Sequence, residues 1–230
     1  MNKEISAEIY TLYWDNSEYL VESHKKVVEH LGLNVNYHHV NGLRHGDWMN
    51  TVLKQTKADI VGFLDPDCVP LNLDIVQYAI EYVSYTKSMI GCAQSSNHIF
   101  PYNHIFAAPC FLFIDRERWN SLGQPSFLEN NNSDVAENVS RVFEENKVPY
   151  KALYPTSFER EPVEGVWRLS NYGYFGIGTV FANSIYHLYQ GRYQQNVELF
   201  SQRCQDIING TFNVRNMFSS VDEYQGRICN

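Results

Sequence analysis

Two aspartates one residue apart, Asp65 and Asp67, are the residues whose spacing most directly indicates chemistry. They follow the largely apolar segment 58–64, and Pro66 between them restricts the turn. Two carboxylates in such a turn can point to the same side. Oxygen ligands of this kind suit Mg²⁺ or Mn²⁺, which commonly complete their coordination with substrate phosphates. The pair is a candidate metal–diphosphate site, and the alternative is a solvated Asp-Pro turn.

The elements that must position this pair alternate between strand and helix. Hydrophobic patterning predicts strands over 9–13, 35–40, 58–64, 88–93 and 106–114, and helices over 17–31, 47–56 and 73–86. Asp47 is a candidate N-cap for the second helix. This alternation predicts an α/β fold with a mostly parallel central sheet and right-handed crossovers. In such sheets ligands bind outside the carboxyl ends of the strands, where Asp65 and Asp67 are expected.

The second half of the chain is less regular. We expect a short helix from Arg116, a helix from an N-cap at Ser133 to about residue 146, a strand over 148–153, loops over 158–178, a strand or turn over 185–189 and a helix over 194–209. The sequence shows no internal repeat and no Pro/Gly-rich linker. We therefore expect residues 1–230 to form a single domain.

The composition excludes several classes of function. The net charge of −8 argues against a general nucleic-acid binder, which needs a basic surface to neutralise phosphates. The five cysteines form no CxxC pair, which argues against a zinc or redox motif. No stretch approaches the roughly 18 apolar residues of a membrane span, and the N-terminus has no apolar signal segment. These features predict a cytoplasmic protein without a membrane span.

The segment TKADIVGFLDPDCVP at 56–70 resembles the DxD segment of GT-A glycosyltransferases. More loosely, the chain resembles the small viral GT-A domains. The resemblance implies a Rossmann-like GT-A domain with a nucleotide-sugar half at about 1–100 and a less regular acceptor half at about 101–230. It also implies a hexosyl- or deoxyhexosyltransferase that uses Mn²⁺ or Mg²⁺. Such an enzyme moves the sugar of a nucleoside-diphosphate donor, on family frequency a UDP-sugar, to a hydroxyl of a glycan or other acceptor.

The same resemblance implies roles for residues that contact the donor. The end of the first strand, with Thr11, Tyr13 and Trp14, would contact the nucleoside, and His45 would lie in the loop that reaches the base and ribose. The alternatives are a core strand end and a surface histidine. The segment IYHLYQGR at 185–192 is similar to the H-L-x-x-G segment of the family.

That similarity makes His187 a third metal ligand beside Asp65 and Asp67, and Arg192 a contact for the diphosphate. A histidine satisfied inside the core is the alternative for His187. The family also places an acidic general base near residue 134, so Asp134 is the first candidate and Glu137 the second. Both acids would equally suit a helix N-terminus.

Two other functions remain open from the sequence. A nucleotidyltransferase-like enzyme would use similar acidic metal ligands, although the segment after the first strand lacks its usual Gly-rich loop with a basic residue. A non-catalytic nucleotide- or carbohydrate-binding domain could keep the fold. Trp167 and Tyr172 are candidates for stacking on sugars in any of these cases.

Overall fold

A computed structural model describes residues 5–96, 98, 100, 103–159, 165–191, 193–222, 224 and 228. Its six-stranded sheet contains, in spatial order, β2 (Val35–His39), β1 (Ala7–Tyr13), β3 (Ile60–Leu64), β6 (Ile105–Asp115), β5 (Met89–Ser95) and β7 (Lys151–Leu153). The pairs β1–β2, β1–β3 and β5–β7 are parallel, whereas β6 runs antiparallel to both of its neighbours. The predicted α/β fold with a mostly parallel central sheet is confirmed.

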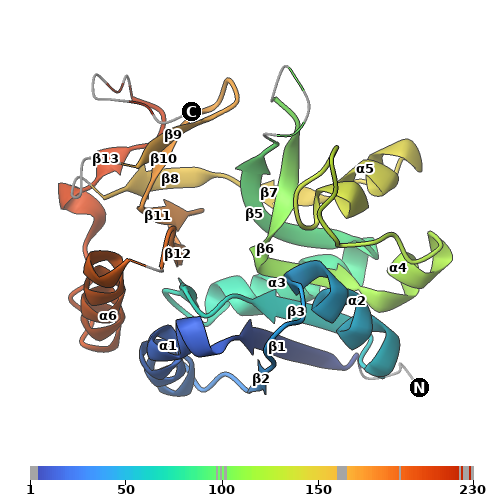
Figure 1. The fold of residues 1–230 in the computed structure, drawn as a ribbon, viewed down its shortest axis with the longest axis horizontal. Helices are drawn as coiled ribbons and strands as arrows, with labels where there is room; N and C mark the ends of the chain where they lie inside the picture. Colours follow the sequence, from blue (N-terminus) through green and yellow to red (C-terminus); the bar gives the residue numbers. More distant parts are fainter. Residues whose placement is uncertain are drawn as a thin grey trace.

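A second sheet lies beside the first, on the left in Figure 1. Its five strands are, in spatial order, β13 (Phe218–Ser219), β8 (Pro155–Phe158), β11 (Gly178–Phe181), β12 (Ile185–Leu188) and β4 (Cys68–Pro70). A separate antiparallel pair, β9 (Val166–Leu169) and β10 (Gly173–Gly176), lies above it in the same view. Because β4 follows β3 after a short turn, the chain passes from one sheet to the other at the acidic pair.

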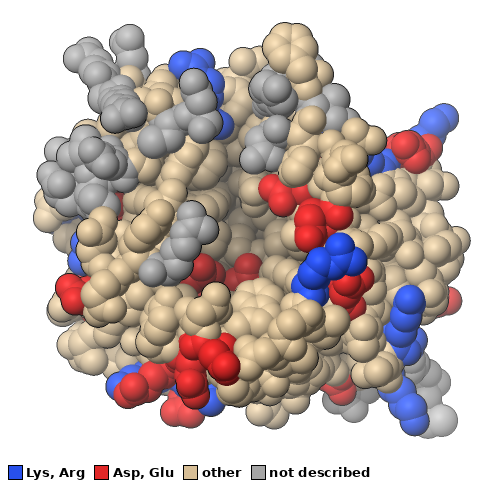
Figure 2. Space-filling model, viewed as in Figure 1, with Lys and Arg blue, Asp and Glu red and all other residues tan. Residues whose placement is uncertain are grey.

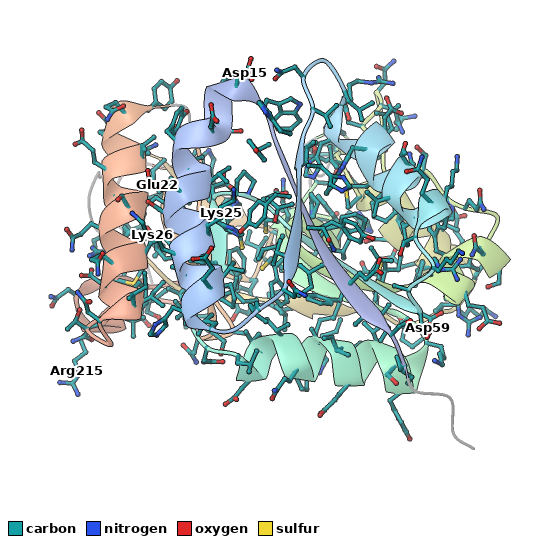
Figure 3. The ribbon with its side chains drawn as sticks, turned by 90° about the horizontal axis from the view of Figure 1, so that it is seen from below. Asp15, Glu22, Lys25, Lys26, Asp59 and Arg215 are labelled. Atoms are coloured by element: carbon teal, nitrogen blue, oxygen red, sulfur yellow. The ribbon has the colours of Figure 1, made fainter. Side chains whose placement is uncertain are left out.

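Six helices of the described chain accompany these sheets: α1 (Glu18–His30), α2 (His45–Gln55), α3 (Asp74–Thr86), α4 (Arg116–Ser121), α5 (Glu137–Glu145) and α6 (Gln194–Ile208). Short 3-10 turns are η1 (Asp15–Ser17) and η2 (Val214–Asn216). In Figure 3 α1 and α6 lie side by side. Throughout the described ranges, no helix is both long enough and apolar enough to cross a membrane.

Two apolar clusters fix the six-stranded sheet because β3 and almost all of β6 are buried along their length. One cluster packs α3 side chains such as Val76 and Val83 against Ile60 and Phe113. The other joins α2, α4 and α5 to the sheet and contains Trp119. A third cluster joins α1 and α6 to the second sheet. The sheet is thus held rigidly, and its carboxyl edge can position functional groups.

Three expectations about local structure are wrong. The helix α2 begins at His45 with Arg44 at its N-cap, and Asp47 lies in the first turn, where its carboxylate accepts a hydrogen bond from Arg44. The helix α5 begins at Glu137 rather than at Ser133, which closes a turn with Asn130.

The segment predicted as loops over 158–178 contains β9 and β10 and the ends of β8 and β11. The strands of the second sheet pair with segments distant in sequence, such as β4 with β12 and β8 with β13. Local periodicity cannot reveal such pairing, because the strands are only two to four residues long.

An ion pair between a half-buried arginine and a buried carboxylate anchors α6 to the end of β8. Arg203 donates to Glu159 through Nε at 2.6 Å and through a terminal nitrogen at 3.1 Å, and Glu159 is 7% exposed. Removing one partner leaves a buried charge uncompensated. We expect Arg203→Met to lower the free energy of unfolding by about 3 kcal/mol, measured by urea denaturation. The control is Arg215→Met, because Arg215 projects outward in Figure 3; equal losses would contradict the assignment.

Candidate functional site

Hydrogen bonds hold the turn that carries the two aspartates. The backbone N–H of Asp65 donates to the carbonyl of Cys110 on β6 at 2.9 Å. The N–H of Cys68 then donates back to the carbonyl of Asp65 at 3.0 Å, which closes the turn around Pro66 and Asp67. The pair is therefore fixed to the buried centre of the six-stranded sheet, at the carboxyl end of β3.

The second sheet brings a histidine to this turn. Strand β12 pairs with β4 so that His187 lies opposite Cys68, and the N–H of Leu188 donates to the carbonyl of Asp67 at 2.9 Å. As a result, Nε2 of His187 lies 3.6 Å from Oδ1 of Asp67. The antiparallel pairing of β4 and β12 thus joins two residues that are far apart in the sequence.

A second histidine faces the other aspartate. His45 is the first residue of α2, and its Nε2 lies 3.3 Å from Oδ1 of Asp65. Burial lowers the pKa of His45 to about 4, so the imidazole is neutral at pH 7. Among the described residues its Nε2 has no hydrogen-bond partner. The neutral Nε2 of His45 therefore lies beside a carboxylate oxygen of Asp65 without a hydrogen bond between them.

The neighbouring Gly46 lets the chain approach another backbone segment closely. A Cβ at Gly46 would lie 2.5 Å from Cα of Leu128 and 2.6 Å from the carbonyl oxygen of Phe127. Only glycine permits this approach. The first turn of α2, and with it His45, is therefore seated directly against the backbone of residues 127–128.

The charges of this site are unbalanced in the protein alone. Burial and the negative charge of Asp67 hold the pKa of Asp65 well above its ordinary value. Burial opposes protonation of His187, but the negative charges of Cys110 and Asp67 outweigh it and raise its pKa. Like charges crowded in this way favour the binding of a divalent cation.

The donor atoms fit Mn²⁺ or Mg²⁺ only in part. No group of three or more His, Cys, Asp or Glu side chains in the described ranges forms a metal-ligand set by itself. The donors instead lie as two pairs, Asp65 with His45 and Asp67 with His187. Carboxylate oxygens and the unpartnered Nε2 of His45 are suitable ligands, and a diphosphate can supply the remaining oxygens. The residues therefore fit a cation that is shared with a phosphorylated ligand.

The closeness of the Asp65 and Asp67 carboxylates predicts that stability of the metal-free protein and binding of a cation oppose each other. Replacing Asp65 with Asn removes a partly buried carboxylate whose ionisation is disfavoured. We expect Asp65→Asn to stabilise the metal-free protein by on the order of 1 kcal/mol, or about 2–4 °C in Tm for a chain of this size. Any rise in Tm that Mn²⁺ with UDP causes in the parent should be lost in the same variant. Differential scanning fluorimetry measures both effects, and a less stable metal-free variant would contradict the prediction.

A cavity of about 210 Å³ opens at this point. Its lining residues come from the end of β1, from η1 and α1, from the acidic turn and from the segment after β12: Leu12, Trp14, Asn16, Ser17, Tyr19, Leu20, His45, Asp65, Pro66, Asp67 and Gly191. Figure 2 shows the face of the molecule hollowed between its two halves, with acidic side chains in and around the hollow. The cavity thus combines the two aspartates with the carboxyl end of the first strand.

The residues expected to contact the nucleoside lie in different environments. Trp14 lines the cavity, donates from Nε1 to the carbonyl of Leu43 at 3.1 Å and has its ring centroid 6.3 Å from that of His45. Tyr13 is stacked on His39, with 4.6 Å between ring centroids. The same His39 lies with its Nε2 2.7 Å from Oδ1 of Asp15. Figure 3 labels Asp15 at the end of the sheet opposite to Asp59.

Thr11 is fully buried and donates from Oγ1 to the carbonyl of Leu64 at 2.7 Å. Its hydroxyl therefore joins β1 to the last residue of β3. Arg192 lies outside the described residues. Its neighbour Gly191 does line the cavity, and the hydroxyl of Tyr19 donates to the Gly191 carbonyl at 3.0 Å. Sequence reasoning missed Tyr19, although its place just after the first strand was a usable signal.

The two acids proposed as bases differ in how the fold uses them. Asp134 lies in the turn before α5 and accepts a hydrogen bond from Nε2 of Gln94 at 3.1 Å. Its other oxygen accepts from the N–H of Val135 at 2.8 Å. Burial raises the pKa of Asp134 above its ordinary value. A carboxylate with a raised pKa has the basicity that proton abstraction requires.

Glu137 is fully buried, and both of its carboxylate oxygens have hydrogen-bond or ion-pair partners. It accepts from the N–H of Asp134 at 2.9 Å, lies 3.0 Å from Nδ1 of His104 and forms an ion pair with Arg141. Burial disfavours its ionised form, but these hydrogen bonds outweigh burial and lower the pKa of Glu137. This geometry suits an anchor that holds the turn of Asp134 better than it suits a base.

Comparisons with known proteins show likeness only at the level of the fold. No protein-family model matches the chain, and no curated protein matches it. A protein from STIV is 11% identical over 80% of this chain and 94% of its own, with a TM-score of 0.45. A mannosyltransferase from Pyrobaculum calidifontis in complex with GDP-Man and Mn²⁺ is 11% identical over 66% of this chain and 55% of its own, with a TM-score of 0.47.

A mutant Drosophila β-1,4-galactosyltransferase 7 in complex with manganese, UDP-Gal and xylobiose is 11% identical over 81% of this chain and 72% of its own, with a TM-score of 0.47. Enzymes that transfer nucleotides are also among the similar structures. Likeness at this level carries no argument about activity. The function must therefore be argued from the geometry of the site.

Proposed function

We propose that this chain is a glycosyltransferase that uses Mn²⁺ or Mg²⁺. In this proposal it transfers a hexosyl or deoxyhexosyl group from a nucleoside-diphosphate sugar, in the first instance a UDP-sugar, to a hydroxyl of a glycan. The observation that carries the proposal is the convergence of Asp65, Asp67 and His45 on one cavity at the carboxyl end of β3, with His187 beside Asp67. Their imbalance of charge suits a cation bound together with a diphosphate.

Each residue has a role in binding the donor. Asp65 and Asp67 would hold the metal, with His187 as the third ligand, and the neutral ring of His45 lies beside Asp65. The bound cation would neutralise charge on the diphosphate leaving group. Trp14 lines the adjoining wall, where an aromatic ring can contact the nucleoside.

When the transfer inverts the anomeric configuration, it requires a base on the acceptor side. The acceptor oxygen forms a bond to the anomeric carbon, while the bond from that carbon to the diphosphate oxygen breaks and its electron pair leaves with the nucleoside diphosphate. The proton of the acceptor hydroxyl passes to the carboxylate of Asp134. The raised pKa of Asp134 favours this step, and Glu137 fixes the turn through the Asp134 N–H.

The proposal is tested by screening donor turnover. Purified chain is incubated with UDP-, GDP-, CMP- and dTDP-sugars, with Mn²⁺, with Mg²⁺ and with EDTA, and release of the nucleotide is measured. We expect metal-dependent release from one nucleotide class, together with a rise in Tm caused by the same nucleotide and metal.

Two results would overturn the proposal. Pyrophosphate formation from a nucleoside triphosphate and a sugar 1-phosphate would identify the chain as a nucleotidyltransferase. Metal-dependent nucleotide binding without turnover of any donor, even with a panel of glycan acceptors present, would identify a binding domain.

A further inference from the structure

His104, just before β6, lies between two carboxylates of α5. Its Nδ1 is 3.0 Å from Oε1 of Glu137, and its Nε2 is 3.1 Å and 3.2 Å from the two oxygens of Glu144. A neutral imidazole has one N–H donor and one acceptor nitrogen, so it can donate to only one of these acids and turns a lone pair toward the other. The doubly protonated ring donates to both. The geometry therefore favours an imidazolium at His104.

The other charged and titratable groups around His104 balance the charge of this ring. Glu137 also pairs with Arg141, and Glu144 accepts a hydrogen bond from the hydroxyl of Tyr150 at 2.7 Å. Burial raises the pKa of Tyr150, so its hydroxyl remains a neutral donor. Among the described residues of this group, two carboxylates thus face one permanent cation, Arg141. A proton on His104 makes the group electrically neutral.

Glu137 connects this group to the proposed base. One of its oxygens faces His104, and the other accepts the backbone N–H of Asp134 at 2.9 Å. Ala136, in the same turn, is buried and has a left-handed conformation with a φ of 70°. Because alanine rarely adopts this conformation, the turn is held by its surroundings and not by its own preference. Weaker anchoring of Glu137 would let the turn move, and the carboxylate of Asp134 with it.

We propose that His104 is a positioning residue of the transfer reaction, and that it acts while its ring is doubly protonated. In that state it holds Glu137, which fixes the turn of Asp134. Loss of the proton removes one donor from Glu137 or Glu144 and turns a lone pair toward a carboxylate, so the turn loosens and transfer slows. His104 is not among the described residues that line the cavity of Asp65 and Asp67, so it acts through the turn.

This inference rests on the proposed function, in which Asp134 is the base. A carboxylate base is lost as the pH falls, whereas a group that acts in its protonated form is lost as the pH rises. The rate profile of the parent should therefore have an acid limb from Asp134 and an alkaline limb from His104.

Two substitutions separate the charge of His104 from its bulk. His104→Arg keeps a positive charge and several N–H donors at every pH, whereas His104→Gln is neutral at every pH. For the donor found in the turnover screen, we expect His104→Gln to lower the transfer rate about tenfold and to lack the alkaline limb. His104→Arg should keep the parent rate and extend it to alkaline pH. An alkaline limb that persists in both variants, or that is absent from the parent, would overturn the proposal.

The matched control is His98→Gln. Burial raises the pKa of Asp134, and the charge of the exposed His98 opposes this rise. Removing His98 should therefore move the acid limb to higher pH and leave the alkaline limb in place. Loss of the alkaline limb in this variant would assign it to His98 instead of His104.

Amide hydrogen exchange gives a second measurement that needs no turnover. The N–H of Asp134 donates to Glu137, so its protection factor, corrected for the intrinsic effect of pH, reports how firmly the turn is held. We expect this protection to fall in the parent as the pH rises, to be low throughout in His104→Gln and to be kept in His104→Arg. The reference amide is that of Leu122, which donates to the carbonyl of Arg118 at the end of α4.

The two measurements distinguish the two proposals. The Tm of each variant confirms that it folds. Unchanged protection of the Asp134 amide in His104→Gln would overturn the role of His104. The expected changes in protection, without turnover of any donor by the parent, would count against the glycosyltransferase alone.

Discussion

Replacing Asp67 with Asn should lower metal-dependent transfer by about a thousandfold. Asp67 is the aspartate that faces His187, at 3.6 Å, and its backbone carbonyl is bonded to β12. The amide preserves shape but removes the charge that balances a divalent cation. If the cation supplies several kcal/mol of stabilisation to the departing diphosphate, its loss corresponds to a factor of this order. Steady-state kinetics over a range of Mn²⁺ concentrations measures the effect.

The form of this loss identifies its cause. A weakened metal site should raise the Mn²⁺ concentration that gives half-maximal activity, and excess metal should restore part of the rate. Glu81→Gln is the control, because it removes one negative charge from an exposed position on α3. A variant at Asp67 that bound Mn²⁺ and UDP as tightly as the parent would show that the turn is structural only.

Replacing Asp134 with Asn should lower the transfer rate by roughly a hundredfold to ten-thousandfold, the range for loss of a general base. Donor and metal binding should be kept, because Asp134 is not among the residues that line the cavity with Asp65 and Asp67. Asn can still accept the hydrogen bond from Gln94 at one oxygen. Single-turnover measurements at saturating donor separate the chemical step from binding.

The pH dependence of the transfer rate gives a second test of Asp134 as the base. Because burial raises the pKa of Asp134, the base is ionised and active above that raised pKa and is lost as the pH falls through it. The acid limb of the parent profile should therefore lie above about pH 3.9, the ordinary value for Asp, and should be absent from the residual activity of Asp134→Asn. An identical acid limb in parent and variant would assign the base elsewhere.

Glu137→Gln is the matched comparison for this experiment. The pKa of Glu137 is lowered, so its contribution to stability is present above its unfolded pKa of about 4.3 and is lost as the pH falls. We expect the variant to be less stable than the parent at pH 7 and to approach the parent at acid pH. It should keep the acid limb of the rate profile, because Asp134 remains.

The sequence by itself determined most of the N-terminal half of the fold. The apolar segment before Asp65 had to form a buried strand, and alternation of strand and helix placed its end at the ligand-binding edge of a parallel sheet. These features are local in the sequence. Burial of β3 on both faces requires apolar residues along its length, and the turn with Pro66 follows it directly. Strands and helices of the six-stranded sheet over the first 115 residues could therefore be predicted to within a few residues, whereas β4 could not.

Tertiary structure alone decided what surrounds the acidic pair. Pairing of β4 with β12 placed His187 beside Asp67, and close packing of Gly46 on residues 127–128 placed His45 beside Asp65. The sequence does not encode such contacts in any local period, because the partners are distant and the strands are short. The different environments of Asp134 and Glu137 have the same origin, since burial and hydrogen-bond partners exist only once α5, β5 and β6 have packed together.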